Sequence, residues 1–185
     1  MTRTARPLRA DAARNRARVL EVAYETFAAE GLAVPVDEIA RRAGVGPGTI
    51  YRHFPTKEAL FEAVISDRVR IIVEQGRTLL ADDPGTALFE FLRSMVRTAA
   101  FDHGMADALE RYGVDFESAA PGAEATFLQL TDELLTTAQR AGTVRADVGA
   151  AELKALLMVC KSGGTLEDGV GERVADIVVD GLRPR

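Results

Sequence analysis

The sequence predicts an all-α protein built from two helical parts. Apolar residues recur every three or four positions in successive segments, which is the spacing of helices that bury one face. No strand-type alternation holds over a useful length, and no internal repeat appears. The chain has 185 residues, of which 47% are hydrophobic, enough for a small N-terminal domain and a second helical domain with its own core.

The first helix is expected at residues 11–30. Leu20, Ala23 and Phe27 form an inward stripe there, and a glycine follows directly as a stop. Residues 1–10, which precede this helix, are expected to be a flexible basic arm.

Two short helices joined by a glycine-bearing turn are expected next. The first has an apolar face, made of Val36, Ile39, Ala40 and Ala43. Gly44 suits its end, because glycine accepts the left-handed conformation without a side-chain clash. Gly46 suits the cap of the second helix, and Pro47 suits its first turn, where an N–H has no helical partner.

The second short helix presents a polar set beside its apolar anchors. Ile50 and Phe54 lie four residues apart and point inward, so other faces carry Thr49, Tyr51, Arg52 and His53. This is the spacing of a helix-turn-helix, and it places hydrogen-bond donors and an aromatic edge where a major groove can receive them. The segment therefore predicts sequence-specific DNA binding, although Tyr51 also suits a packing role.

Helical spacing continues to the end of the chain, at residues 56–81, 84–101, 105–112, 121–141, 149–161 and 168–182. Thr56 caps the long helix at 56–81, which joins the DNA-binding part to the rest. We therefore expect a helix-turn-helix domain at 11–56 and a second helical domain at 57–185.

The charge distribution agrees with a DNA-binding N-terminal domain. The net charge is −5, yet the first 20 residues hold six arginines and one aspartate. Residues 1–60 hold ten basic and seven acidic side chains, so the acidic excess lies in the second domain. Arg3, Arg6 and Arg9 are predicted to reach phosphates or the minor groove; a solvated, disordered tail is the alternative.

The stretch AxRAGVGPGTIYRHFPTKEALFEAV resembles the DNA-binding domain of the TetR family of bacterial transcriptional regulators, and the resemblance covers residues 14–66. It implies a set of DNA-binding residues, namely Pro47, Gly48, Thr49, Tyr51, Arg52, His53 and Lys57, with Arg41 and Arg42 as either phosphate contacts or a solvated face. Pro47 and Arg52 would determine which operator sequence is bound. Arg52 suits either a bidentate contact with guanine or a phosphate contact. The chain departs from the family where Pro35, Val36 and Gly46 replace capping threonines and a serine.

The run AGTVRADVGAAELKALL resembles the SbtR-like C-terminal domain of the same family. That resemblance implies a homodimer formed through residues 149–161 and 168–182, a palindromic operator in double-stranded DNA, and a small-molecule effector. The implied ligand-binding candidates are Phe91, Met95, Phe101, His103, Met105, Leu109, Tyr112, Phe127 and Leu130. For the apolar members plain core packing is the alternative, and for His103 a solvent-exposed turn.

Other classes of protein find little support in the sequence. There are two histidines and one cysteine, and no nucleophile–base set, metal-ligand spacing or cofactor pattern stands out, so we expect neither an enzyme nor a cofactor. Cys160 suits a buried thiol in a reducing cytoplasm, with redox sensing as the alternative. No apolar run approaches a membrane span, and the N-terminus does not resemble a secretory signal. The expected function is a ligand-released repressor; an activator, or a DNA-binding or interaction protein without an effector, stays open.

Overall fold

The computed structural model describes residues 5–98, 120–162 and 169–184, with side chains at 11–98, 120–157 and 169–184. Every regular element in these ranges is a helix, as the sequence predicts. The named helices are α1 (Ala5–Glu30), α2 (Val36–Ala43), α3 (Pro47–His53), α4 (Lys57–Asp82), α7 (Ala123–Arg140), α8 (Ala150–Ser162) and α9 (Val170–Leu182). Residues 87–98 are also helical, whereas the helix expected at 105–112 lies outside the described residues.

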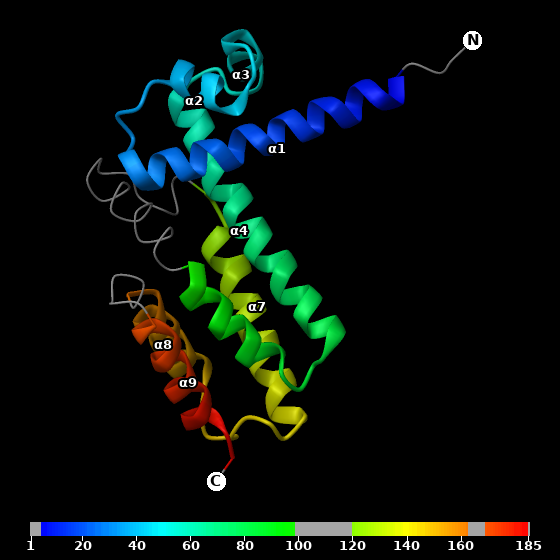
Figure 1. The fold of residues 1–185 in the computed structure, drawn as a ribbon. Coiled ribbons are helices and arrows are strands. Elements are labelled where there is room, and N and C mark those ends of the chain that lie inside the picture. Colours follow the sequence, from blue (N-terminus) through cyan, green and yellow to red (C-terminus); the bar gives the residue numbers. More distant parts are fainter. Residues whose placement is uncertain (1–4, 99–119, 163–168, 185) are drawn as a thin grey trace.

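Helix α1 begins six residues earlier than the sequence predicts. Residues 5–10 continue the helix instead of forming the expected flexible arm. Pro7 does not prevent this, because it lies in the first turn, where backbone N–H groups have no helical partner. The N-terminal half of α1 therefore extends past α2 and α3 as a continuous helix (Figure 1).

The turn between α2 and α3 is closed by backbone hydrogen bonds. Gly44 adopts φ 68° and ψ 31°, the left-handed conformation that a residue with a side chain rarely takes. Its N–H donates to the carbonyl of Arg41 at 3.2 Å, and the N–H of Val45 donates to the carbonyl of Ala40 at 3.0 Å. This pair of bonds is the Schellman pattern, and it fixes the direction in which the chain enters α3.

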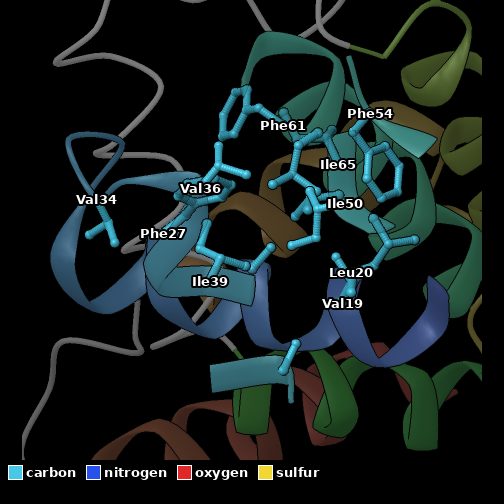
Figure 2. Packing of buried hydrophobic residues seen from close by; sticks show 14 of the residues in the cluster. Val19, Leu20, Phe27, Val34, Val36, Ile39, Ile50, Phe54, Phe61 and Ile65 are labelled. Carbon is cyan, nitrogen blue, oxygen red and sulfur yellow. The ribbon is translucent and has the colours of Figure 1, made fainter. Parts of the chain in front are cut away.

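The first hydrophobic core holds α1, α2, α3 and the first half of α4 together, and we call these elements the head. The rings of Phe27 and Phe61 meet edge to face with centroids 5.6 Å apart, which joins α1 to α4. Ile39 and Ile50 fill the centre from the two short helices, and both are almost fully buried (Figure 2). Helix α3 is thus anchored mainly by Ile50, and Phe54 follows directly after it.

The second core lies in the body, which we define as the second half of α4, residues 87–98, α7, α8 and α9. Helix α4 contributes to both cores: Leu60 and Val64 pack in the head, and Ile72 and Val73 pack in the body. At 26 residues it is roughly 39 Å long, and it runs between the two parts without a break (Figure 1). The start of α7 also reaches the head, because Ala123 packs against the first core.

Helices α4 and α7 approach closely at Gly76. This glycine is buried, and a Cβ placed on it would lie 2.6 Å from a methyl carbon of Leu130 on α7. Leu130 is only 2% exposed, so the missing side chain makes room for a leucine against the α4 backbone. Gly76 thereby sets the separation of the two helices that reach both head and body.

The loop from α7 to α8 is tied to its surroundings by polar contacts. Gly142 ends α7 in the left-handed conformation at φ 71°. The hydroxyl of Thr143 donates to the carbonyl of Gly85 at 2.7 Å, which joins this loop to the loop after α4. The amide of Gln139 donates to the carbonyls of Arg145 and Val148, so the segment that resembles the SbtR-like domain is an ordered connection.

Candidate nucleic-acid interface

Helix α3 turns its polar residues to solvent. Ile50 is 1% exposed and Phe54 is 4% exposed, whereas Tyr51 is 46% exposed. Pro47, Gly48, Arg52 and His53 are also exposed, and Thr49 is half-buried. An exposed tyrosine ring beside an arginine and a histidine is a surface that can hydrogen-bond and stack against base edges and phosphates.

Gly48 has no packing reason to be a glycine. A Cβ placed on it would meet nothing within 4 Å, and its φ is not in the left-handed region. Glycine inside a helix costs about 1 kcal/mol relative to alanine, so the protein gains no stability from this choice. A residue without a side chain does, however, allow another molecule to approach the backbone closely.

The caps of the three helices differ as the sequence suggests. Thr56 accepts a hydrogen bond from the N–H of Ala59 at 3.0 Å and so caps α4. Neither Pro35 before α2 nor Gly46 before α3 supplies a side-chain cap, which agrees with the departures noted at these positions.

Lys57 lies at the first position of α4, where the helix dipole disfavours positive charge. Partial burial lowers the pKa of its ammonium group, and the charge of neighbouring Glu58 opposes that shift. Among the described residues no carboxylate lies within ion-pair distance of Lys57. A half-buried cation in this state suits an anion supplied by another molecule.

Arg41 and Arg42 are bound to carboxylates within the head. Arg41 donates two hydrogen bonds to Glu38, at 2.7 and 2.8 Å. Arg42 donates to Glu38 at 2.8 Å and also binds Glu30 at the end of α1, so it joins α1 to α2. A phosphate contact by either arginine stays a prediction, and it would have to compete with these bonds.

The pKa values of these groups follow from the same contacts. Hydrogen bonds from Arg41 and then Arg42 lower the pKa of Glu38 to about 2. The hydrogen bond from Arg42 also lowers the pKa of Glu30, and the two carboxylates raise the pKa of Arg42. The cluster is charged throughout the physiological range and links two helices of the head.

Helix α1 brings two further arginines to the helix-turn-helix, which the sequence alone did not place. The guanidinium carbon of Arg16 lies 5.5 Å from the centroid of the Phe54 ring, at the end of α3. A terminal nitrogen of Arg18 lies 4.0 Å from where a Cβ on Gly44 would be, beside the turn that precedes α3. The sequence shows the run of arginines, but only the packing of α1 against α2 and α3 shows that Arg16 lies by Phe54 and Arg18 by Gly44.

The ligand-binding candidates in the body divide into two groups. Five of them lie outside the described residues: Phe101, His103, Met105, Leu109 and Tyr112. The other four belong to the second core or pack against it: Phe91, Met95, Phe127 and Leu130. The rings of Phe91 and Phe127 lie 6.2 Å apart, so packing explains these positions without a ligand, and ligand contact stays a prediction.

An open groove of about 320 Å³ lies between α4 and the start of α7. It is lined by Ser66, Val69, Arg70, Val73, Glu74, Arg77, Pro121, Gly122, Ala123 and Thr126, a set that includes none of the predicted ligand-binding residues. Arg70 is engaged by Asp67 and Glu74, at 2.8 Å to each. In the described parts of the chain, no cluster of three or more metal-ligating side chains is found.

Helix α9 leaves apolar surface uncovered. Ile177 on α9 is 70% exposed, while Ala175, Val179 and Leu182 face the body core. Val174 is half-buried and lies one turn before Ile177, so α9 carries a second apolar stripe that points away from the core. In the stretches that can be described, no helix is both long and apolar enough to span a bilayer.

An exposed polar recognition helix, anchored by a buried isoleucine and preceded by a tight glycine turn, defines a helix-turn-helix DNA-binding protein. Comparison with known families agrees. The family model for tetR-type bacterial regulatory proteins matches residues 19–64, and the model for the C-terminal domain of SbtR-like transcriptional regulators matches residues 83–184. The chain belongs to the TetR family of transcriptional regulators, whose members bind DNA.

Solved structures and curated relatives support the same conclusion. A TetR transcription regulatory protein from Mycobacterium vanbaalenii is 65% identical with a TM-score of 0.84, over 96% of this chain and 100% of that one. The TetR regulator SCO0520 from Streptomyces coelicolor is 35% identical with a TM-score of 0.79, over 91% and 98%. HTH-type transcriptional regulators of Staphylococcus aureus are 36% identical over 76 residues, which span only 41% of their length.

Proposed function

We propose that the protein is a homodimeric repressor that binds a palindromic operator and leaves it when a small apolar molecule binds the body. The observation that supports DNA contact by α3 is its division into a buried anchor, Ile50, and an exposed polar side that carries Tyr51, Arg52 and His53. None of these three side chains belongs to the buried core of the head.

In this proposal the α3 residues divide into base readers and backbone contacts. Arg52 and Pro47 bear operator choice, because Arg52 can donate two hydrogen bonds to a guanine edge. Thr49, Tyr51 and His53 contact the DNA backbone and neighbouring bases. Lys57, which has no ion-pair partner among the described residues, binds a phosphate. Gly48 lets the sugar-phosphate backbone lie directly against α3.

Dimerisation follows from the outward stripe of α9. Ile177 and its half-buried neighbour Val174 are apolar groups in water, and a second copy of the same face would cover them. A two-fold dimer would also hold two copies of α3 at a fixed spacing, which is what a palindromic operator requires.

Control by an effector is supported by the way that α4 and α7 connect the two cores. Both helices pack in the head as well as in the body, and they meet at Gly76. A ligand that bound the body better in one crossing geometry would shift α4 and hence the spacing of the two recognition helices. Coupling of this kind typically amounts to about 1–3 kcal/mol.

The test is selection of duplexes from a random-sequence library by the purified full-length protein, followed by binding measurements on the recovered sequences. A palindromic consensus, bound by two copies of the chain and lost in the Arg52→Ala and Tyr51→Ala variants, is the expected result. Recovery of no consensus, or equal binding by the double variant, would contradict the proposal. Repression is then tested with a reporter placed behind the selected operator.

A further inference from the structure

We propose that Arg16 and Arg18 of α1 bind phosphates of the duplex on either side of the recognition helix, and that Arg41 and Arg42 do not. This inference rests on the proposed DNA binding and adds to it the residues that supply the electrostatic part of the affinity. Its basis is the pairing of cations with carboxylates in the head.

The described cations of the head, in residues 11–64, fall into two sets. Arg14 pairs with Asp11, Arg41 pairs with Glu38, and Arg42 pairs with both Glu30 and Glu38. The other set has no carboxylate within ion-pair distance among the described residues, and it consists of Arg16, Arg18, Arg52 and Lys57. Two of these four, Arg52 and Lys57, already belong to the proposed interface.

Arg16 lies in line with the apolar residues of α1, at a position where the helical spacing would place another apolar residue. It precedes Val19 and Leu20 by one turn on the same side of the helix, and those two residues are buried in the head. Its guanidinium lies over the ring of Phe54, which immediately follows α3. The face of the ring attracts the cation and favours its position next to the C-terminal end of α3.

Arg18 lies at the other end of the recognition helix. Its terminal nitrogen is close to Gly44, in the turn that leads into α3. The residue is exposed and forms no ion pair with any residue that the structure describes, so its charge can bind a partner in solution. Arg16 therefore lies near the C-terminal end of α3, and Arg18 lies near the turn that precedes α3.

The free energy of binding a phosphate should differ between the arginines that pair with carboxylates and those that do not. A phosphate at Arg16 or Arg18 would bind a guanidinium that pairs with no carboxylate among the described residues, so no ion pair has to be broken. A phosphate at Arg42 would approach the carboxylates of Glu30 and Glu38, which repel it and already hold the donors of that guanidinium. Phosphate contacts from α1 therefore add affinity, whereas those from the α2 arginines would replace bonds that hold the head together.

The experiment is the salt dependence of binding to a duplex recovered by the selection described above. Each neutralised phosphate contributes about 0.9 to the slope of log affinity against log salt concentration. We expect Arg18→Gln and Arg16→Gln each to lower the magnitude of the slope by about 1, and the double variant by about 2. Arg41→Gln is the matched control, because it removes the same charge from another exposed side chain, and its slope should equal that of the unaltered protein.

Two further variants separate charge from packing. Arg16→Lys and Arg18→Lys keep the charge and should keep the slope, whereas loss of a purely structural contact would change affinity at all salt concentrations alike. Unaltered slopes in both glutamine variants, or a loss in Arg41→Gln equal to that in Arg18→Gln, would overturn the inference. If the unaltered protein selects and binds no duplex, the proposed function itself fails, and that outcome is distinct from a bound duplex with unchanged slopes.

Discussion

Replacing Gly76 by alanine tests whether the close approach of α4 and α7 is set by the missing side chain. The new Cβ would lie 2.6 Å from one methyl carbon of Leu130 and 3.0 Å from the other, well inside the normal contact distance. Leu130 is almost fully buried, so it has little space into which it can rotate.

The expected magnitude combines two opposing effects. Overpacking of a filled core costs about 1–3 kcal/mol. Alanine is favoured over glycine in a helix interior by about 1 kcal/mol, which offsets part of that cost. We therefore expect Gly76→Ala to lower the free energy of unfolding by up to about 2 kcal/mol. Gly48→Ala is the matched control, since its Cβ meets nothing and only the favourable helix effect remains.

The assay is equilibrium denaturation by urea, with the Leu130→Ala variant included to complete a double-mutant cycle. Leu130→Ala alone should cost about 2–5 kcal/mol, because it leaves a cavity. The double variant should cost less than the sum of the single changes, since the alanine methyl occupies part of that cavity, with a coupling of about 0.5–3 kcal/mol. Strictly additive costs, or a Gly76→Ala protein that is more stable than the unaltered one, would refute the reasoning.

Three other predictions concern the surface. Gly48→Ala should leave the fold as stable or up to about 1 kcal/mol more stable, which thermal unfolding checks. The same change should weaken operator binding about tenfold, because the methyl group would separate α3 from the DNA backbone, and a binding titration checks this. If the proposed dimer forms through α9, Ile177→Glu should give a monomer in sedimentation measurements. Ile71→Glu places a charge on another exposed isoleucine and should leave that proposed dimer intact. Because its pKa is depressed to about 2, ionised Glu38 stabilises the folded state at pH above about 4.5, and this stabilisation is lost as the pH falls from 4.5 to 2. In the Glu38→Gln variant the free energy of unfolding should therefore fall less over this pH range.

Each of these has an outcome that contradicts it. Equal operator affinity in Gly48→Ala would show that no close approach occurs at that residue. A dimer that persists in Ile177→Glu would place the interface elsewhere. Identical acid-unfolding profiles for Glu38→Gln and the unaltered protein would show that the arginine bonds to Glu38 contribute nothing to stability.

The sequence predicted the helices well because their signals are local. Helix α2 ends at Gly44, α3 begins with Pro47, and Thr56 caps α4, each as the sequence predicts. The start of α1 was predicted too late, because the arginine-rich residues 5–10 carry no apolar stripe to reveal a helix that extends past the core.

By itself, the sequence determined the fold class, the family and the side of α3 that faces away from the core, since periodicity and turn residues act over a few positions. Only the tertiary structure decided which of the many charged and small residues act across helices. It distinguishes Arg42, which binds carboxylates on α1 and α2, from Arg16 and Arg18, which lie beside the helix-turn-helix and pair with no described carboxylate. It also shows that Leu130 packs against Gly76. The physical reason is that ion pairs and close packing depend on which helices cross and at what distance, and no local pattern of residues encodes that distance.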